Sequence, residues 1–264
     1  MKRFLSIFLI ISFCLSFAAC SSKDNNGDNG VTVTEETTQA GPAFKTETKE
    51  YSKDFSDENG RVVYTVKAKL PQITADLPED IAKDINRSVY GFFEDACESA
   101  ESNIKNASAF MDSQNHDIPW ARSLDYEITL CTEKYYSITV RDSFTMFGVE
   151  NADPTLIGIN FDVVRGKMCG ISEFFYENHS YENVKQILVD SFIAKDISSV
   201  FYGGAELTEE QSDIAYHVAD MENFYLTDKG IGFYFSKNAF DPQQYGTFVA
   251  HYAWEDVAVV LKKP

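Results

Sequence analysis

The sequence is poor in basic residues compared with acidic ones. Its 264 residues include 23 Lys and Arg against 41 Asp and Glu, which gives a formal net charge of −18. A field of this sign disfavours nucleic acid and anionic lipid surfaces as partners, and it speeds the approach of a cationic partner. The simpler interpretation is that acidity only keeps the protein soluble. Under either interpretation we expect no nucleic-acid partner.

Histidine and cysteine are also scarce, and no familiar catalytic motif is present. None of the four histidines pairs with another at the spacing of metal ligands, and the five cysteines include no CxxC pair. The GxSxG, HExxH, P-loop and GxGxxG patterns are absent. Carboxylates are too numerous for an acid–base pair to be chosen from the sequence. We therefore expect no metal, no cofactor and no catalytic residue.

The first twenty residues have the organisation of a bacterial export signal. Lys2 and Arg3 precede an apolar run over residues 4–17, which is shorter than a typical membrane-spanning helix. The run ends in Phe-Ala-Ala-Cys, and small residues directly before a cysteine resemble the lipobox of bacterial lipoproteins. We therefore expect residues 1–19 to be a lipoprotein signal peptide and Cys20 to be lipidated. Ordinary secretion, with an incidental Cys20, is the alternative.

A flexible tether is expected to follow the lipidated cysteine. Residues 21–41 are rich in Gly, Asn, Ser and Thr and contain no large apolar side chain apart from two valines, so they cannot bury enough surface to fold. The predicted tether covers residues 20–48. Loss of Lys2 and Arg3 with the signal would change the net charge from −18 to −20. The expected location is the cell membrane, with a lipid anchor and the folded part on the extracytoplasmic face.

The remaining chain predicts an α+β protein. Hydrophobic residues make up 44% and aromatic residues 14% of the sequence, which is enough for a packed core, and the length suits one large or two medium domains. Residues 151–154, Asn-Ala-Asp-Pro, have turn chemistry and mark the expected boundary. We predict two small domains, residues 49–152 and residues 153–264, each an antiparallel sheet packed against helices.

Local patterns place most of the elements. In the first domain they predict a strand over residues 61–70 ended by Pro71, an amphipathic helix from an Asp76 cap to about Asn106, an irregular stretch over residues 110–123, and a hairpin of residues 124–131 and 135–147. In the second domain they predict a helix capped by Ser180, a helix with a Thr208–Gln211 capping box, a hairpin over residues 223–235, a strand over residues 245–252 and a terminal helix over residues 254–262.

The rest of the chain is expected to be organised around residues 155–175. This segment opens as a strand with one apolar and one mostly polar face, and the polar face carries Asn160 and Asp162. Gly166 then provides a turn that accepts a positive φ, Lys167 follows it, and the segment is expected to return as an extended piece. Asn160, Asp162, Gly166 and Lys167 are our candidates for a binding site or a structural turn. For Asp162 we favour hydrogen bonding to the turn over catalysis.

Other side chains leave two interpretations open. The cysteines of the folded part can form at most one disulfide, and buried small apolar residues are the favoured interpretation; they are Cys97, Cys131 and Cys169. Three aromatic residues suit contact with a sugar or a protein partner, but packing explains them equally well; they are Trp120, Phe201 and Tyr202.

The order of elements resembles paired extracytoplasmic domains of bacteria, which are domains of unknown function. They form the extracellular half of the lysozyme-sensing anti-sigma factor RsiV and the N-terminal region of PdaC-type peptidoglycan deacetylases. The likeness of the second domain to its RsiV-like counterpart is carried by Asn160-Phe161-Asp162, Gly166-Lys167, residues 171–175 and the closing strand at residues 230–235. The first domain resembles its PdaC-like counterpart by pattern, over residues 64–70 and 124–140. Members often carry Gly-Gly-Ala-His before the central strand, whereas residues 146–152 of this chain contain no histidine.

Lipobox, tether, charge and resemblance together predict a lipid-anchored extracytoplasmic binding protein without catalytic activity. The expected ligand is a cell-wall-related molecule such as peptidoglycan, or a cationic protein such as lysozyme. No deacetylase domain follows residue 264 and only residues 1–3 precede the apolar run, so we expect neither deacetylation nor signal transmission. The alternatives are a cell-wall glycan or peptide hydrolase that uses carboxylates, and a structural or assembly lipoprotein.

Overall fold

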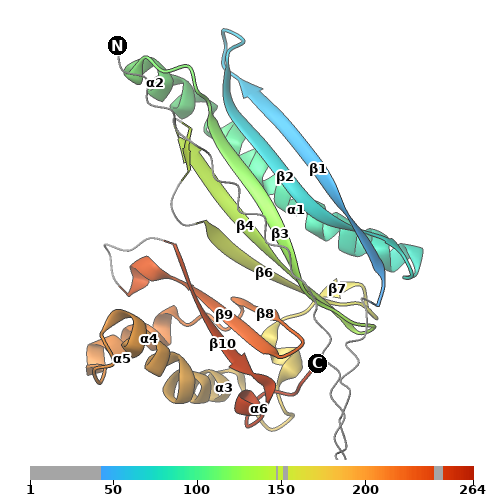
Figure 1. The fold of residues 1–264 in the computed structure, drawn as a ribbon, viewed down its shortest axis with the longest axis vertical. Coiled ribbons are helices and arrows are strands. Elements are labelled where there is room, and N and C mark those ends of the chain that lie inside the picture. The colour runs from blue at the N-terminus through green and yellow to red at the C-terminus, as the bar shows by residue number, and fades with distance from the viewer. Residues whose placement is uncertain (1–42, 147, 151–153, 241–245) are drawn as a thin grey trace, which may run out of the picture. The chain divides into compact units, whose positions relative to one another are not determined.

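The structure confirms the predicted α+β class. The computed structural model describes residues 43–146, 148–150, 154–240 and 246–264, and these residues form two sheets and several helices (Figure 1). The predicted signal peptide, Cys20 and most of the predicted tether lie outside the described residues, as do residues 151–153 of the expected boundary at residues 151–154. None of the described helices combines the length with the apolar character that a membrane crossing requires.

Seven strands of the described residues form the larger sheet (Figure 1). Their order is β1-β2-β3-β4-β6-β7, with β5 alongside β4. The strands are β1 (Lys45–Ser56), β2 (Val62–Ala75), β3 (Trp120–Cys131), β4 (Tyr135–Met146), β5 (Val149–Glu150), β6 (Thr155–Asp162) and β7 (Lys167–Met168). Neighbours are antiparallel except β2 and β3, which are parallel. A helical crossover joins these two strands, as a parallel pair requires.

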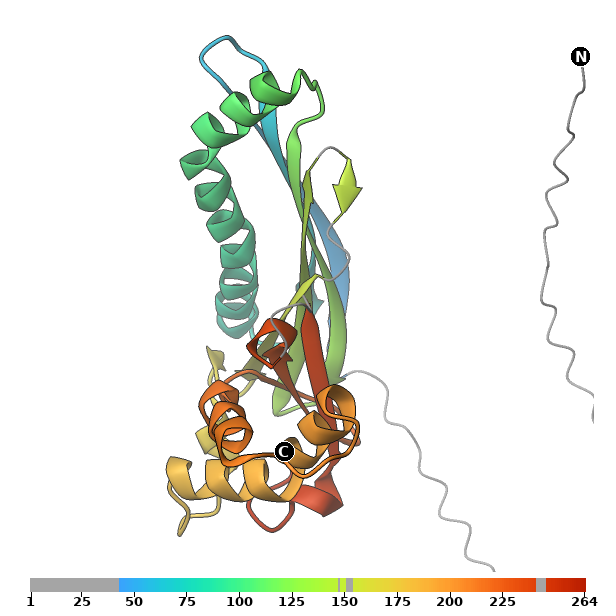
Figure 2. The same ribbon diagram turned by 90° about the vertical axis from the view of Figure 1, so that its left-hand side faces the viewer.

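One face of the larger sheet packs against α1 (Glu79–Ser102), which is followed by α2 (Ile104–Gln114). Figure 2 shows α1 running alongside the strands. Strand alternation turns a row of β2 side chains toward this helix, and all of them are buried: Tyr64, Val66, Ala68 and Leu70. Apolar positions of α1 at steps of three or four residues complete the core: Ile85, Val89, Phe93, Ala96 and Ala100.

The smaller sheet has the order β10-β9-β8 and is antiparallel. Its strands are β8 (Phe224–Leu226), β9 (Gly230–Ser236) and β10 (Thr247–Ala253). The helical elements of this half are η1 (Ile171–Phe174), α3 (Tyr181–Leu188), the π-helical segment η2 (Val189–Ile193), α4 (Ala194–Phe201), α5 (Glu209–Val218), η3 (Lys237–Ala239) and α6 (Trp254–Val257). Their apolar sides form a second hydrophobic core with the smaller sheet.

The chain passes from one hydrophobic core to the other after β6. Phe161 and Val163 belong to the core beside α1, whereas Cys169 and Ile171 belong to the core of the smaller sheet. β6 lies in the second predicted domain, residues 153–264, yet its ladder partner is β4 in the first. β1 begins inside the range predicted for the tether.

Several local predictions are confirmed. The hairpins β3–β4 and β8–β9 lie where alternation placed them. The Ser180 side chain accepts a hydrogen bond from the Asn183 N–H at the start of α3, and Thr208 and Gln211 form the expected capping box at α5. Gly166 has a φ of 66°, which is the left-handed conformation expected of the turn.

The prediction that Pro71 ends the first strand is wrong, because β2 continues through it to Ala75. Both backbone polar groups of Ile73 bond to the Asn86 side chain, with Ile73 N–H donating to Oδ1 at 2.8 Å and Nδ2 donating to the Ile73 carbonyl at 2.9 Å. The backbone of Ile73 therefore faces away from β1. Pro71 has the same orientation by strand alternation, so no ladder hydrogen bond requires its missing N–H.

The predicted long helix is also wrong at both ends. Asp76 does not cap it: Asp76 has a φ of 71°, and Pro78 occupies the N-cap position. The helix ends at Ser102, four residues before the predicted end at about Asn106, and the Asn103 side chain donates to the Ser99 carbonyl at 2.8 Å. Such side-chain bonds compete with the helix ladder. A second helix, α2, then fills part of the stretch that we expected to be irregular.

Two predictions in the second half are wrong as well. The extended piece after Gly166 is limited to β7, because the chain then enters η1, where the Glu222 carboxylate accepts from the Ile171 N–H at 3.3 Å. The terminal helix is limited to α6, because Leu261 forms a bridge with Phe175 and so leaves helical geometry. The cysteines Cys97, Cys131 and Cys169 are free thiols, and no disulfide joins them.

Candidate functional site

Asn160, predicted as a binding or turn residue, joins the two sheets. Its side chain is buried, with 4% exposed. Nδ2 donates to the Phe224 carbonyl at 3.0 Å, and Oδ1 accepts from the Leu226 N–H at 3.2 Å and from the Ser137 hydroxyl at 2.7 Å. The amide thus pairs with the backbone of β8 as a neighbouring strand would. These contacts satisfy every polar atom of the group, so we assign Asn160 a structural role.

Gly158, two residues earlier on the same face of β6, allows this close approach. A Cβ atom at this position would lie 2.2 Å from the Phe224 carbonyl oxygen, which is a backbone atom and cannot move aside easily. The Gly158 N–H donates to the Tyr234 hydroxyl at 2.9 Å. The mostly polar face of β6 is therefore covered by β8 and β9.

Asp162 holds the turn between β6 and β7. Its carboxylate accepts from the Arg165 backbone N–H at 2.9 Å and from Arg165 Nε at 2.8 Å, and the same guanidinium also contacts Glu173. Burial alone would raise the pKa of the Asp162 carboxyl, but the hydrogen bonds and charge of Arg165 outweigh burial and hold this pKa below its usual value. Gly166 and Lys167 complete the turn, with Lys167 opposite Asp162 in the β6–β7 ladder.

The three aromatic candidates are packing residues. The Trp120 ring lies 5.5 Å from that of Phe144 and 6.2 Å from that of Tyr64. Phe201 packs against Phe240 with ring centroids 5.1 Å apart. The Tyr202 hydroxyl donates to a backbone carbonyl at 3.2 Å. None of the three is among the exposed large apolar residues of the described chain.

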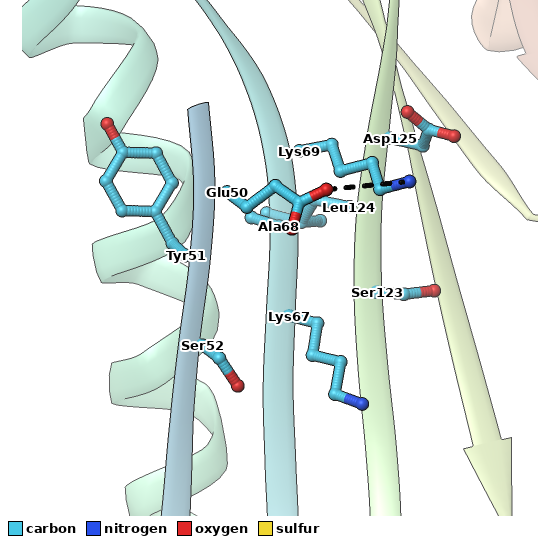
Figure 3. A pocket seen from close by; sticks show the side chains of 9 residues that line it. All are labelled: Glu50, Tyr51, Ser52, Lys67, Ala68, Lys69, Ser123, Leu124 and Asp125. Atoms are coloured by element: carbon cyan, nitrogen blue, oxygen red, sulfur yellow. Dashed lines mark ion pairs between the residues drawn. The ribbon is translucent and has the colours of Figure 1, made fainter. Parts of the chain in front are cut away.

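A groove lies instead on the part of the larger sheet that β8 does not cover (Figure 3). Strands β1, β2 and β3 line it, and its volume is about 490 Å³. The face is the one opposite α1, because the lining side chains alternate with buried residues that point toward the helix. Its polar members are all exposed: Glu50, Ser52, Lys67, Lys69, Ser123 and Asp125.

The ladder arranges these side chains in rows across the strands. Ser52 is opposite Lys67, and Lys67 is opposite Ser123. In the adjacent row Glu50 is opposite Lys69, and an ion pair of 3.9 Å joins them (Figure 3). Lysine amines and hydroxyls can donate to a ligand, whereas carboxylates and hydroxyls accept from it. The groove can therefore bind a polar ligand through many hydrogen bonds.

In the described part of the chain the potential metal ligands are dispersed, and the Cys169 thiol is buried. No group of three or more His, Cys, Asp or Glu side chains there is placed to hold a metal ion. Burial raises the pKa of the Cys169 thiol to about 12, so this cysteine is not an activated nucleophile.

Sequence patterns missed the groove because they missed β1. On the side of β1 that faces the core, Lys49 and Lys53 alternate with Tyr51 and Phe55, so the period-two apolar signal is interrupted. Each lysine amine lies over the ring of the following aromatic residue, at 5.5 Å for Tyr51 and 4.8 Å for Phe55. Tyr51 and Phe55 are four residues apart and therefore lie on the same face of an extended chain. This spacing was the signal in the sequence that could have indicated the strand.

Comparison with solved structures identifies the fold. A member of the DUF3298 family from Bacteroides fragilis superposes with a TM-score of 0.56 and 13% sequence identity, over 84% of this chain and 95% of that chain. This chain has the fold of a DUF3298 protein. A DUF3298 family protein from Pseudomonas aeruginosa matches with a TM-score of 0.49 and 12% identity, over 83% of this chain and 94% of that one. No family model and no curated protein matches the sequence.

The DUF3298 fold agrees with the resemblance seen in the sequence. Proteins of that family include the RsiV-like and PdaC-like extracytoplasmic domains. At 13% identity the likeness extends to the fold alone. The family description is that of a domain of unknown function, so function has to be argued from the residues of this chain.

Proposed function

We propose that the protein is a lipid-anchored extracytoplasmic binding protein without catalytic activity, and that it recognises a cell-wall-related ligand in the groove of β1, β2 and β3. The observation that carries this proposal is the open polar groove, in which charged and hydroxyl side chains from three strands face solvent. Rigid strands suit such a site because they fix its side chains before the ligand arrives.

The location rests on the N-terminus and on the fold. Small residues followed by Cys20 resemble a lipobox, and the polar stretch after it suits a tether. The shared fold with a DUF3298 protein supports the same environment. A folded body held by a flexible tether can reach a ligand that is fixed in the wall.

Binding rather than turnover is supported by the state of the candidate carboxylates. Asp162, the most prominent candidate for catalysis in the sequence, is bonded to Arg165 and is committed to the turn. In the groove, the Glu50 carboxylate forms an ion pair with Lys69. Glu173, the second acid at the turn, is also bonded to Arg165, so both carboxylates there are held in ion pairs.

A cationic protein such as lysozyme is a second candidate ligand. The net charge of −18 favours its approach. The charged residues that line the groove are two lysines and two carboxylates, which cancel. A cationic protein would therefore be attracted by the acidic surface outside the groove, and its binding should weaken steeply with salt.

Titration calorimetry of the full chain in mild detergent tests the proposal. We expect soluble disaccharide-peptide fragments of peptidoglycan to bind with micromolar to millimolar affinity and without being cleaved. Lysozyme is titrated in parallel at low and high salt. The proposal fails if neither binds, and its non-enzymatic part fails if labelled peptidoglycan is hydrolysed and the turnover disappears in Asp162→Ala.

A further inference from the structure

We infer that Lys67 forms an anion subsite in the groove and takes the carboxylate of an acidic saccharide; this inference rests on the proposed function. Lys67 belongs to a row of polar side chains that crosses four strands. Ser52 of β1, Lys67 of β2, Ser123 of β3 and Ser143 of β4 are successive ladder partners. A single ammonium group thus lies among hydroxyl groups on both sides.

The charge of the neighbouring Lys69 is balanced by a carboxylate, whereas the charge of Lys67 is not. Lys69 forms an ion pair with Glu50 and lies next to Asp125, which also lines the groove. Asp125 in turn is opposite Arg141 of β4. Within the described part of the chain, Lys67 has neither an ion pair nor a hydrogen bond to a side chain. In Figure 3 its side chain extends toward β3, away from the Glu50–Lys69 pair.

The groove is also electrically neutral in a strongly acidic protein. Its four charged side chains cancel, whereas the chain as a whole carries −18. An anion therefore meets less repulsion here than at a surface of average charge. The charge that remains free to pair with it is that of Lys67, because the charge of Lys69 is already balanced. The groove therefore favours a ligand with one negative group, which pairs with the Lys67 ammonium.

The rest of the groove suits a ligand rich in hydroxyl groups. Ser52 and Ser123 can each donate and accept hydrogen bonds, and Glu50 and Asp125 can accept from ligand hydroxyls. The aliphatic stems of Lys67 and Lys69 supply apolar surface for the C–H faces of a sugar ring. A saccharide with a carboxylate meets all of these groups, whereas a neutral saccharide leaves the Lys67 ammonium without a partner. Two kinds of sugar provide this group, a lactyl-bearing amino sugar and a uronic acid, and both are pyranoses that carry a carboxylate.

Calorimetric titration of the full chain with three saccharides tests this subsite. The probes are an N-acetylglucosamine–N-acetylmuramic acid disaccharide with a free lactyl carboxylate, tetragalacturonate, and neutral chitotetraose. We expect the acidic probes to bind at least about tenfold more tightly than chitotetraose, as a charge-assisted hydrogen bond provides. Whichever acidic probe binds more tightly identifies the source of the carboxylate, and both results support the subsite.

Two variants make the test specific. Lys67→Gln should lower the affinity for the acidic probes about tenfold or more and leave chitotetraose binding unchanged. Lys83→Gln removes the same charge from an exposed position of α1, on the other side of the sheet, and should bind as the native protein does. Backbone amide shifts at Ser52 and Ser123 should move on addition of the acidic probes.

The outcomes separate this inference from the proposed function. Equal affinity of Lys67→Gln and the native protein for the acidic probes overturns the subsite, and so does equal affinity for chitotetraose and the acidic probes. Both results leave the proposed cell-wall binding intact. Failure of all three saccharides together with the disaccharide-peptide fragments overturns the proposed function and the subsite with it.

Discussion

The Asp162 carboxylate stabilises the turn after β6 in a pH-dependent way. Arg165 holds its pKa below the value of about 3.9 found in unfolded chains. The contribution is therefore fully present above that unfolded value and is lost as the pH falls through the folded pKa. We expect Asp162→Asn to lower the free energy of unfolding by about 1–2 kcal/mol at pH 7. Between pH 5 and pH 3, the free energy of unfolding of this variant should fall by less than that of the native protein.

Urea unfolding at pH 7, pH 5 and pH 3 measures this effect, and Asp54→Asn is the matched control. Asp54 is an exposed carboxylate of β1 that accepts from the Thr65 hydroxyl, so its substitution should change stability by less than about 0.5 kcal/mol. Identical acid dependence of the native protein and Asp162→Asn would contradict the role of this carboxylate.

Asn160 shows why a residue's role was harder to predict than its position. The sequence places Asn160 on the polar face of a strand, and the strand is confirmed. Its partners Phe224 and Leu226 are more than sixty residues away in the chain, so no local pattern indicates that this face is covered. A buried amide fully bonded to backbone and an exposed binding residue look alike in a single sequence.

The packing of β6 against β8 depends on a glycine, and a second glycine provides its control. Gly158→Ala would place a methyl group 2.2 Å from the Phe224 carbonyl oxygen. We expect it to destabilise the protein by about 3 kcal/mol or more, through displacement of β8. Gly91→Ala in α1 meets no atom within 4 Å and should stabilise the protein by about 0.5–1 kcal/mol.

Thermal unfolding and hydrogen exchange of β8 amides compare the two variants. Faster exchange of the Leu226 amide is expected in Gly158→Ala alone, because that amide donates to Asn160 and Ser137. A Gly158→Ala protein with native stability and native exchange would contradict the close approach of the two sheets.

Elements with a regular apolar period were predictable, and those fixed by distant contacts were not. The β3–β4 and β8–β9 hairpins and the α5 capping box follow from local residues. The path of β2 through Pro71 depends on Asn86 of α1, thirteen residues beyond Ile73. The early end of α6 depends on the bridge between Leu261 and Phe175. In both cases a hydrogen bond between residues distant in the sequence determines where the element ends, which local propensity does not fix.

The candidate site was predictable only in part for a related reason. The sequence directed attention to residues 160–167, which prove to connect the sheets and hold a turn. The groove depends on the register of β1, β2 and β3, and β1 is an edge strand of the described sheet with lysines on its core-facing side. Charged residues on edge strands prevent unwanted pairing, and they also hide the strand from a search for apolar alternation.

We propose that the protein consists of a folded ligand-binding part on the extracytoplasmic side of the membrane, which a flexible segment joins to a lipid anchor. Its two sheets and two hydrophobic cores are built from the described residues, and the groove on β1, β2 and β3 is the surface offered to the ligand. Display requires that the chain is exported, cleaved after Ala19 and acylated on Cys20. Access to a cell-wall ligand depends on this processing.

Mass spectrometry of the N-terminus of the protein, purified from its native cells, tests display most directly. We predict a chain that lacks residues 1–19, begins at Cys20, carries acyl chains on that cysteine and is recovered in the membrane fraction. Cys20→Ser should abolish the acyl mass and release the protein from membranes. An unmodified chain that begins at Met1 and is recovered from the cytosol would contradict the account.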